Sequence, residues 1–218
     1  MQIYDIFLEF VLTLPVLNEY FFMKLVFATG NPGKLREAAE ILGGAFELVT
    51  PAEVGITEDI PENGNTLRAN SQQKADYIYA QTGMDCFADD TGLEIDALGG
   101  APGVHTARYA GEDKDPAANR RRVLAELAGL PFEKRTARFR CVVSLIEDGA
   151  LTVFEGTCEG HIALQESEGV QGFGYDSIFV PIGLDVTLAE ISIEEKNALS
   201  HRGKAMRMLQ CHLQQRHG

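Results

Sequence analysis

The segment of this chain that most constrains its fold is residues 25–42, where an apolar run, a glycine-rich turn and a helical repeat follow one another directly. Residues 25–28 (Leu-Val-Phe-Ala) have the short apolar pattern of a buried strand. The turn Thr-Gly-Asn-Pro-Gly-Lys occupies residues 29–34, and apolar side chains then recur at helical spacing at Leu35, Ala38, Ala39 and Leu42. A buried strand that leads directly into a helix predicts an α/β fold.

Later segments repeat this mixture of strands and helices. We expect short strands at residues 46–49, 86–88 and 93–95, a tight loop at residues 99–103, and helices over residues 66–81 and from Asp115-Pro116 onward. Alternating side chains over residues 137–146 predict a long strand, with residues 151–155 as its hairpin partner. The sequence therefore predicts antiparallel strands joined to the α/β part.

The C-terminal part is expected to be helical. Ser192 and Glu195 have the spacing of a capping box, which starts a helix. Met206, Leu209 and Leu213 then form an apolar stripe at helical spacing. We expect this stripe to pack on the core.

Length, charge and cysteine use limit the organisation and the partners. A chain of 218 residues, 45% of them hydrophobic, suits one sizeable domain or two small intimate lobes. The formal net charge of −13 argues against a nucleic-acid partner and against binding to an anionic membrane. The four cysteines form no CxxC pair, which argues against a zinc site and fits reduced thiols in a cytoplasmic protein.

Residues 1–22 differ from the rest of the chain. They are apolar, but they contain Asp5, Glu9 and Pro15 and no Lys or Arg. These features do not suit a signal peptide or a membrane span. We interpret residues 1–22 as an N-terminal extension outside the core, and residues 23–218 as a single domain of two lobes.

The turn at residues 29–34 is a candidate phosphate site. Free backbone amides at a helix N-terminus and a glycine-rich turn can approach phosphate oxygens closely, and Lys34 would add a positive charge. The alternative is an ordinary turn between a strand and a helix, with Asn31 as the N-cap and Pro32 in the first helical position.

Asp89 and Asp90 follow the predicted strand at residues 86–88 and precede an expected turn. Side chains at such a strand end project into a cleft in α/β folds. Because adjacent strand residues point to opposite faces, only one of the two should face a site. We assign the chemistry to Asp90 and a supporting position to Asp89; the alternative is that both solvate a strand end.

Glu62 and Lys74, which come earlier in the chain than Asp90, complete a candidate metal and phosphate site. Magnesium binds through one or two carboxylates together with waters and substrate phosphates, so Glu62 with Asp90 would be sufficient. Lys74 lies one helical turn after Asn70 and could point at the phosphates. Taken alone, Glu62 and Lys74 also fit ordinary surface residues.

Two later segments are candidates for binding a base. Residues 172–176 (Gly-Phe-Gly-Tyr-Asp) can lay an aromatic ring against a purine, although a structural loop that buries Phe173 is the alternative. Ser200, His201 and Arg202 stand side by side with Lys196 nearby. No carboxylate at catalytic spacing accompanies them, which argues against a Ser-His-Asp triad.

Taken together, these motifs resemble those of the inosine triphosphate pyrophosphatase family, the pyrophosphatases of non-canonical purine nucleoside triphosphates. The resemblance covers residues 23–216, nearly everything after the extension. Its markers, in order, are residues 28–34, 62–64, 88–93, 99–104, 107–109, 172–176, 195–196 and 200–202.

The resemblance implies a fold, an activity and a set of site residues. The fold would be a long central mixed sheet flanked by helices, forming two lobes with a cleft between them, in a homodimer. The activity would be hydrolysis of a purine triphosphate such as ITP, dITP or XTP to the monophosphate and pyrophosphate, with Mg²⁺ held by Glu62 and Asp90 and with Asp90 as the proton acceptor. The implied substrate-binding residues are Thr29, Gly30, Asn31, Pro32, Gly33, Lys34, Lys74, Thr91, Phe173, Gly174, Tyr175, Asp176, Lys196, His201 and Arg202.

Other functions remain open at this stage. A pyrimidine or broad-specificity triphosphate pyrophosphatase could use the same acidic residues. An aspartyl-phosphate phosphatase would need a DxD spacing, which Asp89-Asp90 lacks. A non-catalytic nucleotide sensor would have little need for Glu62 and Asp90 together with Lys34.

Overall fold

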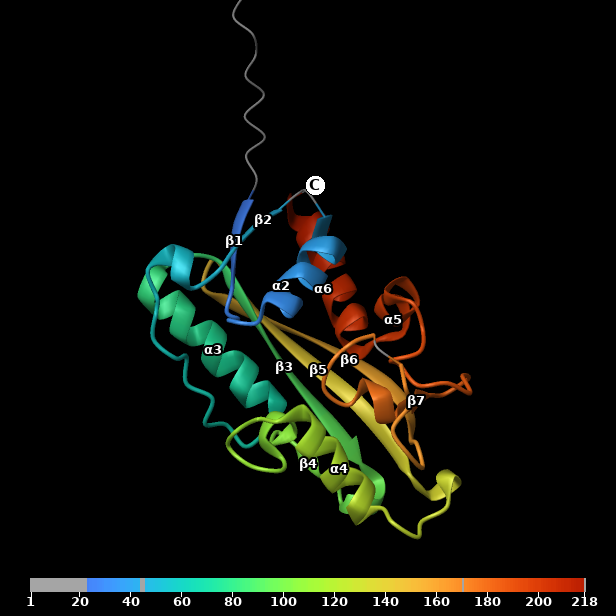
Figure 1. Ribbon diagram of the computed structural model, residues 1–218. Coiled ribbons are helices and arrows are strands. Elements are labelled where there is room, and N and C mark those ends of the chain that lie inside the picture. The colour runs from blue at the N-terminus through green and yellow to red at the C-terminus, as the bar shows by residue number, and fades with distance from the viewer. Residues whose placement is uncertain (1–22, 44–45, 170, 218) are drawn as a thin grey trace, which may run out of the picture.

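The computed structural model describes residues 23–43, 46–169 and 171–217, and the predicted extension at residues 1–22 lies outside these ranges. A seven-stranded mixed sheet runs through the described part in the order β2-β1-β3-β5-β6-β7, with β4 paired to β3 (Figure 1). Its strands are β1 (Met23–Phe27), β2 (Phe46–Val49), β3 (Cys86–Ile95), β4 (Pro102–Gly103), β5 (Thr136–Glu147), β6 (Ala150–Ile162) and β7 (Phe179–Pro181). The α/β fold with a long mixed sheet is confirmed.

Helices cover both faces of this sheet (Figure 1). They are α2 (Pro32–Leu42), α3 (Leu67–Thr82), α4 (Pro116–Glu126), α5 (Ile193–Leu199) and α6 (His201–His217). Val26 and Ala28 pack with Ala75 and Ile78 on the α3 side, whereas Leu25 packs with residues of α2 and α6 on the other. This division follows from strand alternation, and burial of both faces explains the continuous apolar run in β1.

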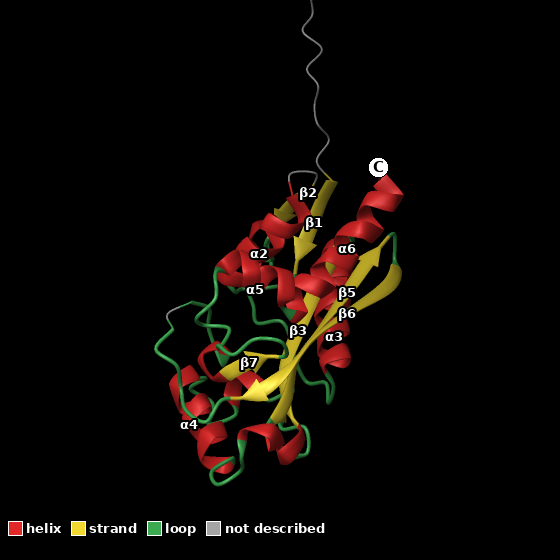
Figure 2. Cartoon of the chain, turned by 90° about the vertical axis from the view of Figure 1, so that its right-hand side faces the viewer, coloured by secondary structure: helices red, strands yellow, loops and turns green. Residues whose placement is uncertain are grey.

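The long hairpin of β5 and β6 contributes to two parts of the molecule (Figure 2). We call the part with β1, β2, α2, α3 and α6 the first lobe and the part with β4, α4 and β7 the second lobe. In the second lobe a separate apolar cluster includes Leu93 of β3, Phe139 of β5, Val123 of α4 and Phe179 of β7. The apolar stripe predicted near the C-terminus lies in the first lobe, where Met206, Leu209 and Leu213 are fully buried. The predicted capping box of Ser192 and Glu195 starts α5.

The prediction of two short strands around a turn at residues 89–92 is wrong. Residues 86–95 form one strand, and each of its ten residues has a partner on β5. Gly92 allows β4 to lie close to this strand, because a Cβ there would lie 2.7 Å from the carbonyl oxygen of Gly103 on β4. Likewise β6 extends well beyond the predicted residues 151–155, since it pairs with β5 along its length.

The other edge of β3 is interrupted. β1 pairs with Cys86 and Phe87, and β4 pairs with Leu93 and Glu94. Within the described residues, no strand pairs with residues 88–92 on this side. The sheet therefore has a gap just beyond the C-terminal end of β1, and Asp89 and Asp90 lie at its margin.

Candidate active site

The N-terminus of α2 stands at the end of β1. Asn31 is its N-cap, and the Asn31 side chain accepts hydrogen bonds from the amides of Gly33 (2.8 Å) and Lys34 (3.3 Å), with Pro32 in the first turn. The expectation of free amides here therefore needs correction, because the cap already uses two of them. Of residues 29–34, the described contacts leave only the Gly30 amide without a hydrogen-bond partner.

Asp89 is the centre of a buried ionic cluster on the α2 and α6 side of the sheet. Lys34 Nζ lies 2.8 Å from Asp89 Oδ1, and Arg202 Nε lies 3.2 Å from Asp89 Oδ2. Arg202 also donates to Glu37 Oε2 at 2.6 Å. Burial by itself would raise the pKa of Asp89, but the charges of Lys34 and Arg202 outweigh it and hold that pKa well below its usual range.

Asp90 belongs to a different cluster, on the α3 side. Asn70 Nδ2 donates to Asp90 Oδ2 at 3.1 Å, and Lys74 Nζ lies 3.8 Å from Asp90 Oδ1. The same ammonium donates to Glu62 Oε1. The prediction that Asp89 and Asp90 face opposite sides is thus confirmed, and the described structure brings Asp90, Glu62 and Lys74 together.

Burial and neighbouring charges oppose each other in this second cluster. Burial raises the pKa of Asp90 above its usual value, against the lowering effects of Lys74 and the Asn70 hydrogen bond. Burial also opposes the charge of Lys74, but Asp90, Asp89 and Glu62 outweigh it, so the Lys74 pKa is raised. Lys74 therefore stays protonated between two carboxylates.

These carboxylates have a donor set that suits magnesium. Glu62 and Asp90 both face the Lys74 ammonium, so their oxygens converge on one point where a cation is stabilised. The described residues contain no group of three or more His, Cys, Asp or Glu that could hold a metal. One or two carboxylates are the usual protein contribution to a magnesium site that also binds phosphates.

The segment around Phe173 is held by its own carboxylate. Asp176 Oδ2 accepts hydrogen bonds from the Phe173 amide (2.7 Å) and from Lys196 Nζ (2.9 Å). Gly172 has a φ of +81°, and a Cβ there would lie 2.1 Å from Asp176 Oδ2. The Asp176 carboxylate therefore makes its contacts within the protein, and these contacts hold the loop around Phe173 in place.

Phe173 itself is half exposed, so the alternative of a loop that buries it is not what the structure shows. Lys196 Nζ lies 5.0 Å and the Arg202 guanidinium 5.6 Å from its ring centre. The Phe173 ring therefore combines an exposed apolar surface with two cations close to it.

His201 and Thr91 carry buried polar atoms without partners. Both ring nitrogens of His201 and the Thr91 hydroxyl lack a hydrogen bond in the described structure. His201 opens α6 and stacks on Phe139 at 4.8 Å between ring centres. Its burial, followed by the charges of Arg202 and Lys196, holds the His201 pKa well below its usual value, so the ring is neutral. Unpaired buried groups of this kind are uncommon and point to a ligand.

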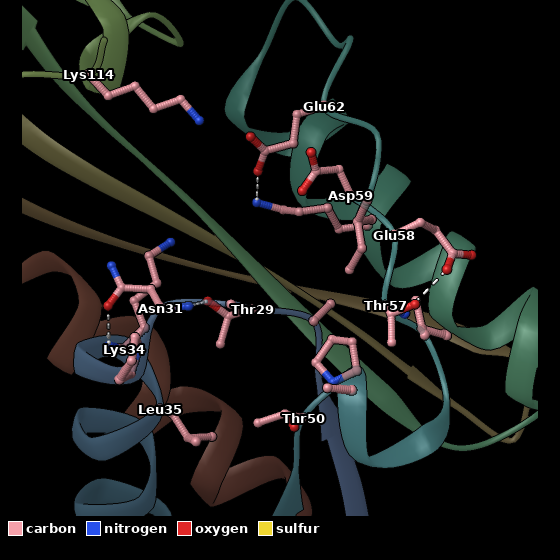
Figure 3. Close-up of a pocket in the computed structure, with 18 residues that line it drawn as sticks. Thr29, Asn31, Lys34, Leu35, Thr50, Thr57, Glu58, Asp59, Glu62 and Lys114 are labelled. Carbon is pink, nitrogen blue, oxygen red and sulfur yellow. Dashed lines mark hydrogen bonds and ion pairs between the residues drawn. The ribbon is translucent and has the colours of Figure 1, made fainter.

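A cavity of about 860 Å³ lies between the turn at residues 29–34 and the ion pair of Glu62 and Lys74 (Figure 3). One wall is formed by the turn at residues 29–34, another by residues 50–60, and Glu62, Lys74 and Lys114 complete it. Several predicted site residues do not line this cavity, among them Asp90, Thr91, Phe173, Lys196, His201 and Arg202. The Asp90 carboxylate lies next to it, 3.8 Å from the ammonium of Lys74, which does line it. The structure therefore separates the predicted site residues into a cavity beside the turn at residues 29–34, with Asp90 next to its Lys74 wall, and an aromatic and cationic region at the α6 side.

Two residues at these clusters were missing from the sequence prediction. Glu37 holds Arg202, and its only sequence signal is its position one turn after Lys34 on α2. Lys114 comes from the second lobe, and no spacing in the sequence links it to the turn at residues 29–34. Its only signal in the sequence is a lysine just before a predicted helix, which is too common to single out Lys114.

Comparison with known proteins adds an independent view. Residues 25–212 match the Ham1 family. The chain is 48% identical over 187 residues to the dITP/XTP pyrophosphatase of Christiangramia forsetii, a match that covers 86% of this chain and 97% of that protein. It is 49% identical over 186 residues to the dITP/XTP pyrophosphatase of Porphyromonas gingivalis, covering 85% and 95% of the two chains.

A solved structure gives the same result for the fold. The Ham1 protein of Coxiella burnetii superposes with a TM-score of 0.83 at 38% identity, covering 89% of this chain and all of that one. None of the helices in the described ranges combines the length and apolarity needed to cross a bilayer.

Proposed function

The chain belongs to the Ham1 family, and on this premise we propose that it hydrolyses non-canonical purine nucleoside triphosphates, dITP, ITP and XTP, to the monophosphate and pyrophosphate. The observation that carries this proposal is the convergence of Glu62 and Asp90 on one cationic point beside the turn at residues 29–34. A metal-assisted attack on a triphosphate needs such a site.

Asp90 is the proposed proton acceptor for the attacking water. Asn70 fixes its carboxylate, and the pKa raised by burial makes it a stronger base than an ordinary aspartate. Lys74 donates to Glu62 and lies beside Asp90, where its charge also favours phosphate oxygens. Water thus attacks the α-phosphorus, and pyrophosphate leaves.

Magnesium is the proposed cofactor, with Glu62 and Asp90 as its protein ligands; when bound, it neutralises phosphate charge and polarises the phosphorus that is attacked. The turn at residues 29–34 supplies the remaining phosphate contacts. Its available donors are the Gly30 amide and the side chains of Thr29, Asn31 and Lys34.

The base is proposed to bind on the α6 side. Phe173 and Tyr175 belong to the ordered segment that ends at Asp176, and the exposed Phe173 ring offers a stacking surface. Neutral His201 has one ring donor and one ring acceptor free, and Arg202 retains Nη2. A 6-oxo group accepts hydrogen bonds from such donors, whereas the 6-amino group of adenine would leave them unpaired.

Assembly and location are a further part of the proposal. We propose a homodimer in the cytoplasm, with no nucleic-acid partner. The net charge of −13 supports the absence of a nucleic-acid partner, and the free thiols of Cys86, Cys141, Cys158 and Cys211 support the location. Light scattering of the purified chain would give about twice the monomer mass if the dimer forms.

The direct test of the activity is a product assay with magnesium and dITP, XTP, dGTP or ATP. We expect pyrophosphate from dITP and XTP, with kcat/KM roughly 10⁴-fold above that for ATP, because unpaired buried donors penalise the wrong base. Release of orthophosphate would contradict the reaction, and equal rates on all four substrates would contradict the selectivity for non-canonical over canonical purines.

A further inference from the structure

The cavity beside the turn at residues 29–34 receives one side chain from the second lobe, that of Lys114. This residue lies between η4 (Thr106–Arg108) and α4 and lines the cavity together with Thr29, Asn31 and Glu62. In Figure 3 the Lys114 side chain extends into the cavity across the opening from Asn31. The cavity therefore has a positive group on the side opposite α2.

The charge of Lys114 is not used within the protein. The other two lysines that line the cavity are already paired, Lys34 with Asp89 and Lys74 with Glu62. Among the described residues, no carboxylate lies within ion-pair distance of the Lys114 ammonium. A triphosphate that enters the cavity could therefore bind Lys114 without breaking an existing ion pair, unlike Lys34 or Lys74.

The backbone around Lys114 fixes where its side chain starts. Lys114 has a φ of +53°, in the left-handed region that non-glycine residues seldom adopt. The next residue, Asp115, is the N-cap of α4 and accepts from the Ala117 amide at 2.9 Å. The turn is thus anchored to α4, and it presents Lys114 to the cavity from a fixed base.

The order of the binding regions indicates which part of the substrate reaches this cavity. Phe173 and Arg202 lie on the α6 side, whereas Asp90 and Glu62 lie on the α3 side of β3. A nucleotide with its base on the α6 side and its α-phosphate near Asp90 must place its outer phosphates beyond that point, in the cavity that Lys114 lines.

We propose that Lys114 binds the β- and γ-phosphates of the substrate, and hence the pyrophosphate product, from the lobe opposite Lys34. The inference rests on the proposed pyrophosphatase function and adds a binding residue to it.

The test compares Lys114→Ala with Lys114→Arg and with Lys134→Ala. Lys134 is an exposed lysine of the same lobe, at the end of η5 (Phe132–Lys134), and does not line the cavity. With dITP and magnesium, we expect Lys114→Ala to raise KM about tenfold with a smaller change in kcat, as expected for loss of one partly exposed charge-assisted contact. Lys114→Arg should restore most of the affinity, and Lys134→Ala should match the wild type.

Calorimetry with inorganic pyrophosphate and magnesium gives a readout that does not need turnover. We expect Lys114→Ala to weaken pyrophosphate binding about tenfold and Lys134→Ala to leave it unchanged. If wild type and Lys114→Ala have equal KM for dITP and equal affinity for pyrophosphate, or if the wild type binds no pyrophosphate, the inference is overturned. Failure of the proposed function would show differently, as a wild-type chain that binds pyrophosphate through Lys114 and releases none from dITP.

Discussion

Lys34 Nζ lies 2.8 Å from Asp89 Oδ1, on the face of β3 opposite the cluster that contains Asp90. Two carboxylates that are adjacent in the sequence thus pair with different cations, Asp89 with Lys34 and Arg202, and Asp90 with Lys74. The Asp89 carboxylate is fully enclosed and compensated by Lys34 and Arg202. Asp90 has a raised pKa and is the proposed metal ligand and proton acceptor. On this proposal a structural residue, Asp89, and a reactive residue, Asp90, follow one another on a single strand.

Asp89→Asn should mainly affect folding. The change leaves Lys34 and Arg202 buried without their shared carboxylate, and removal of one partner from a buried ionic group costs about 3–5 kcal/mol. Urea denaturation monitored by circular dichroism would measure the loss in the free energy of unfolding.

Asp90→Asn is the matched control for that experiment. Because burial disfavours the charged form of Asp90, loss of its charge should change the unfolding free energy by less than about 1 kcal/mol. Turnover should nevertheless fall by roughly 10²–10⁴. Equal stability of the two variants would refute the division of roles between Asp89 and Asp90.

Glu62→Gln should alter the magnesium requirement. An amide keeps the shape of the side chain and one oxygen but removes the charge that favours a divalent cation. We expect the magnesium concentration for half-maximal rate to rise about tenfold, with a smaller effect at saturating metal. A magnesium titration at fixed dITP measures this, and an unchanged midpoint would remove Glu62 from the metal site.

His201 should make the stability depend on pH. The pKa of His201 is depressed in the folded protein, so below about pH 6.5 the unfolded chain binds a proton that the folded chain does not. The contribution of His201 to the free energy of unfolding is therefore fully present above about pH 6.5. It is lost as the pH is lowered, by at most about 1.4 kcal/mol per pH unit.

The variant His201→Phe retains the ring that stacks on Phe139 and lacks the titrating group. Urea denaturation of both proteins between pH 5 and 7 should give a shallower slope for the variant. Parallel slopes would show that His201 does not make this contribution.

Gly172→Ala should damage substrate binding more than Gly174→Ala. Both glycines have positive φ, +81° and +67°, so each alanine has a similar backbone cost of about 1–2 kcal/mol. Only the Cβ at residue 172 would collide with Asp176, which holds Lys196 and the Phe173 amide. We expect a clearly higher KM for dITP in Gly172→Ala, and equal KM values in the two variants would count against the role of this loop.

The sequence predicted the parts of the site that depend on local pattern. Strand alternation separated Asp89 from Asp90, and the cap residues Asn31 and Pro32 were recognisable from their positions. The turn expected after Asp90 was wrong because the long pairing of β3 with β5 outweighs the local preference of Thr91 and Gly92 for a turn.

The partners of the site residues could not be predicted in the same way. Asp176 binds Lys196 and the Phe173 amide, and Arg202 binds Glu37, which lies 165 residues away in the chain. Such contacts depend on how α2, α6 and the segment after β6 pack together. Lys114 likewise lines the cavity only because the segment between η4 and α4 lies next to the turn at residues 29–34.

The most direct test of the account is the position of water attack. Hydrolysis of dITP with magnesium in H₂¹⁸O, followed by mass spectrometry of both products, reports which phosphorus receives the water oxygen. With Asp90 directing water to the α-phosphorus, we expect one ¹⁸O in dIMP and none in pyrophosphate. Label in pyrophosphate, or release of labelled orthophosphate, would contradict the account.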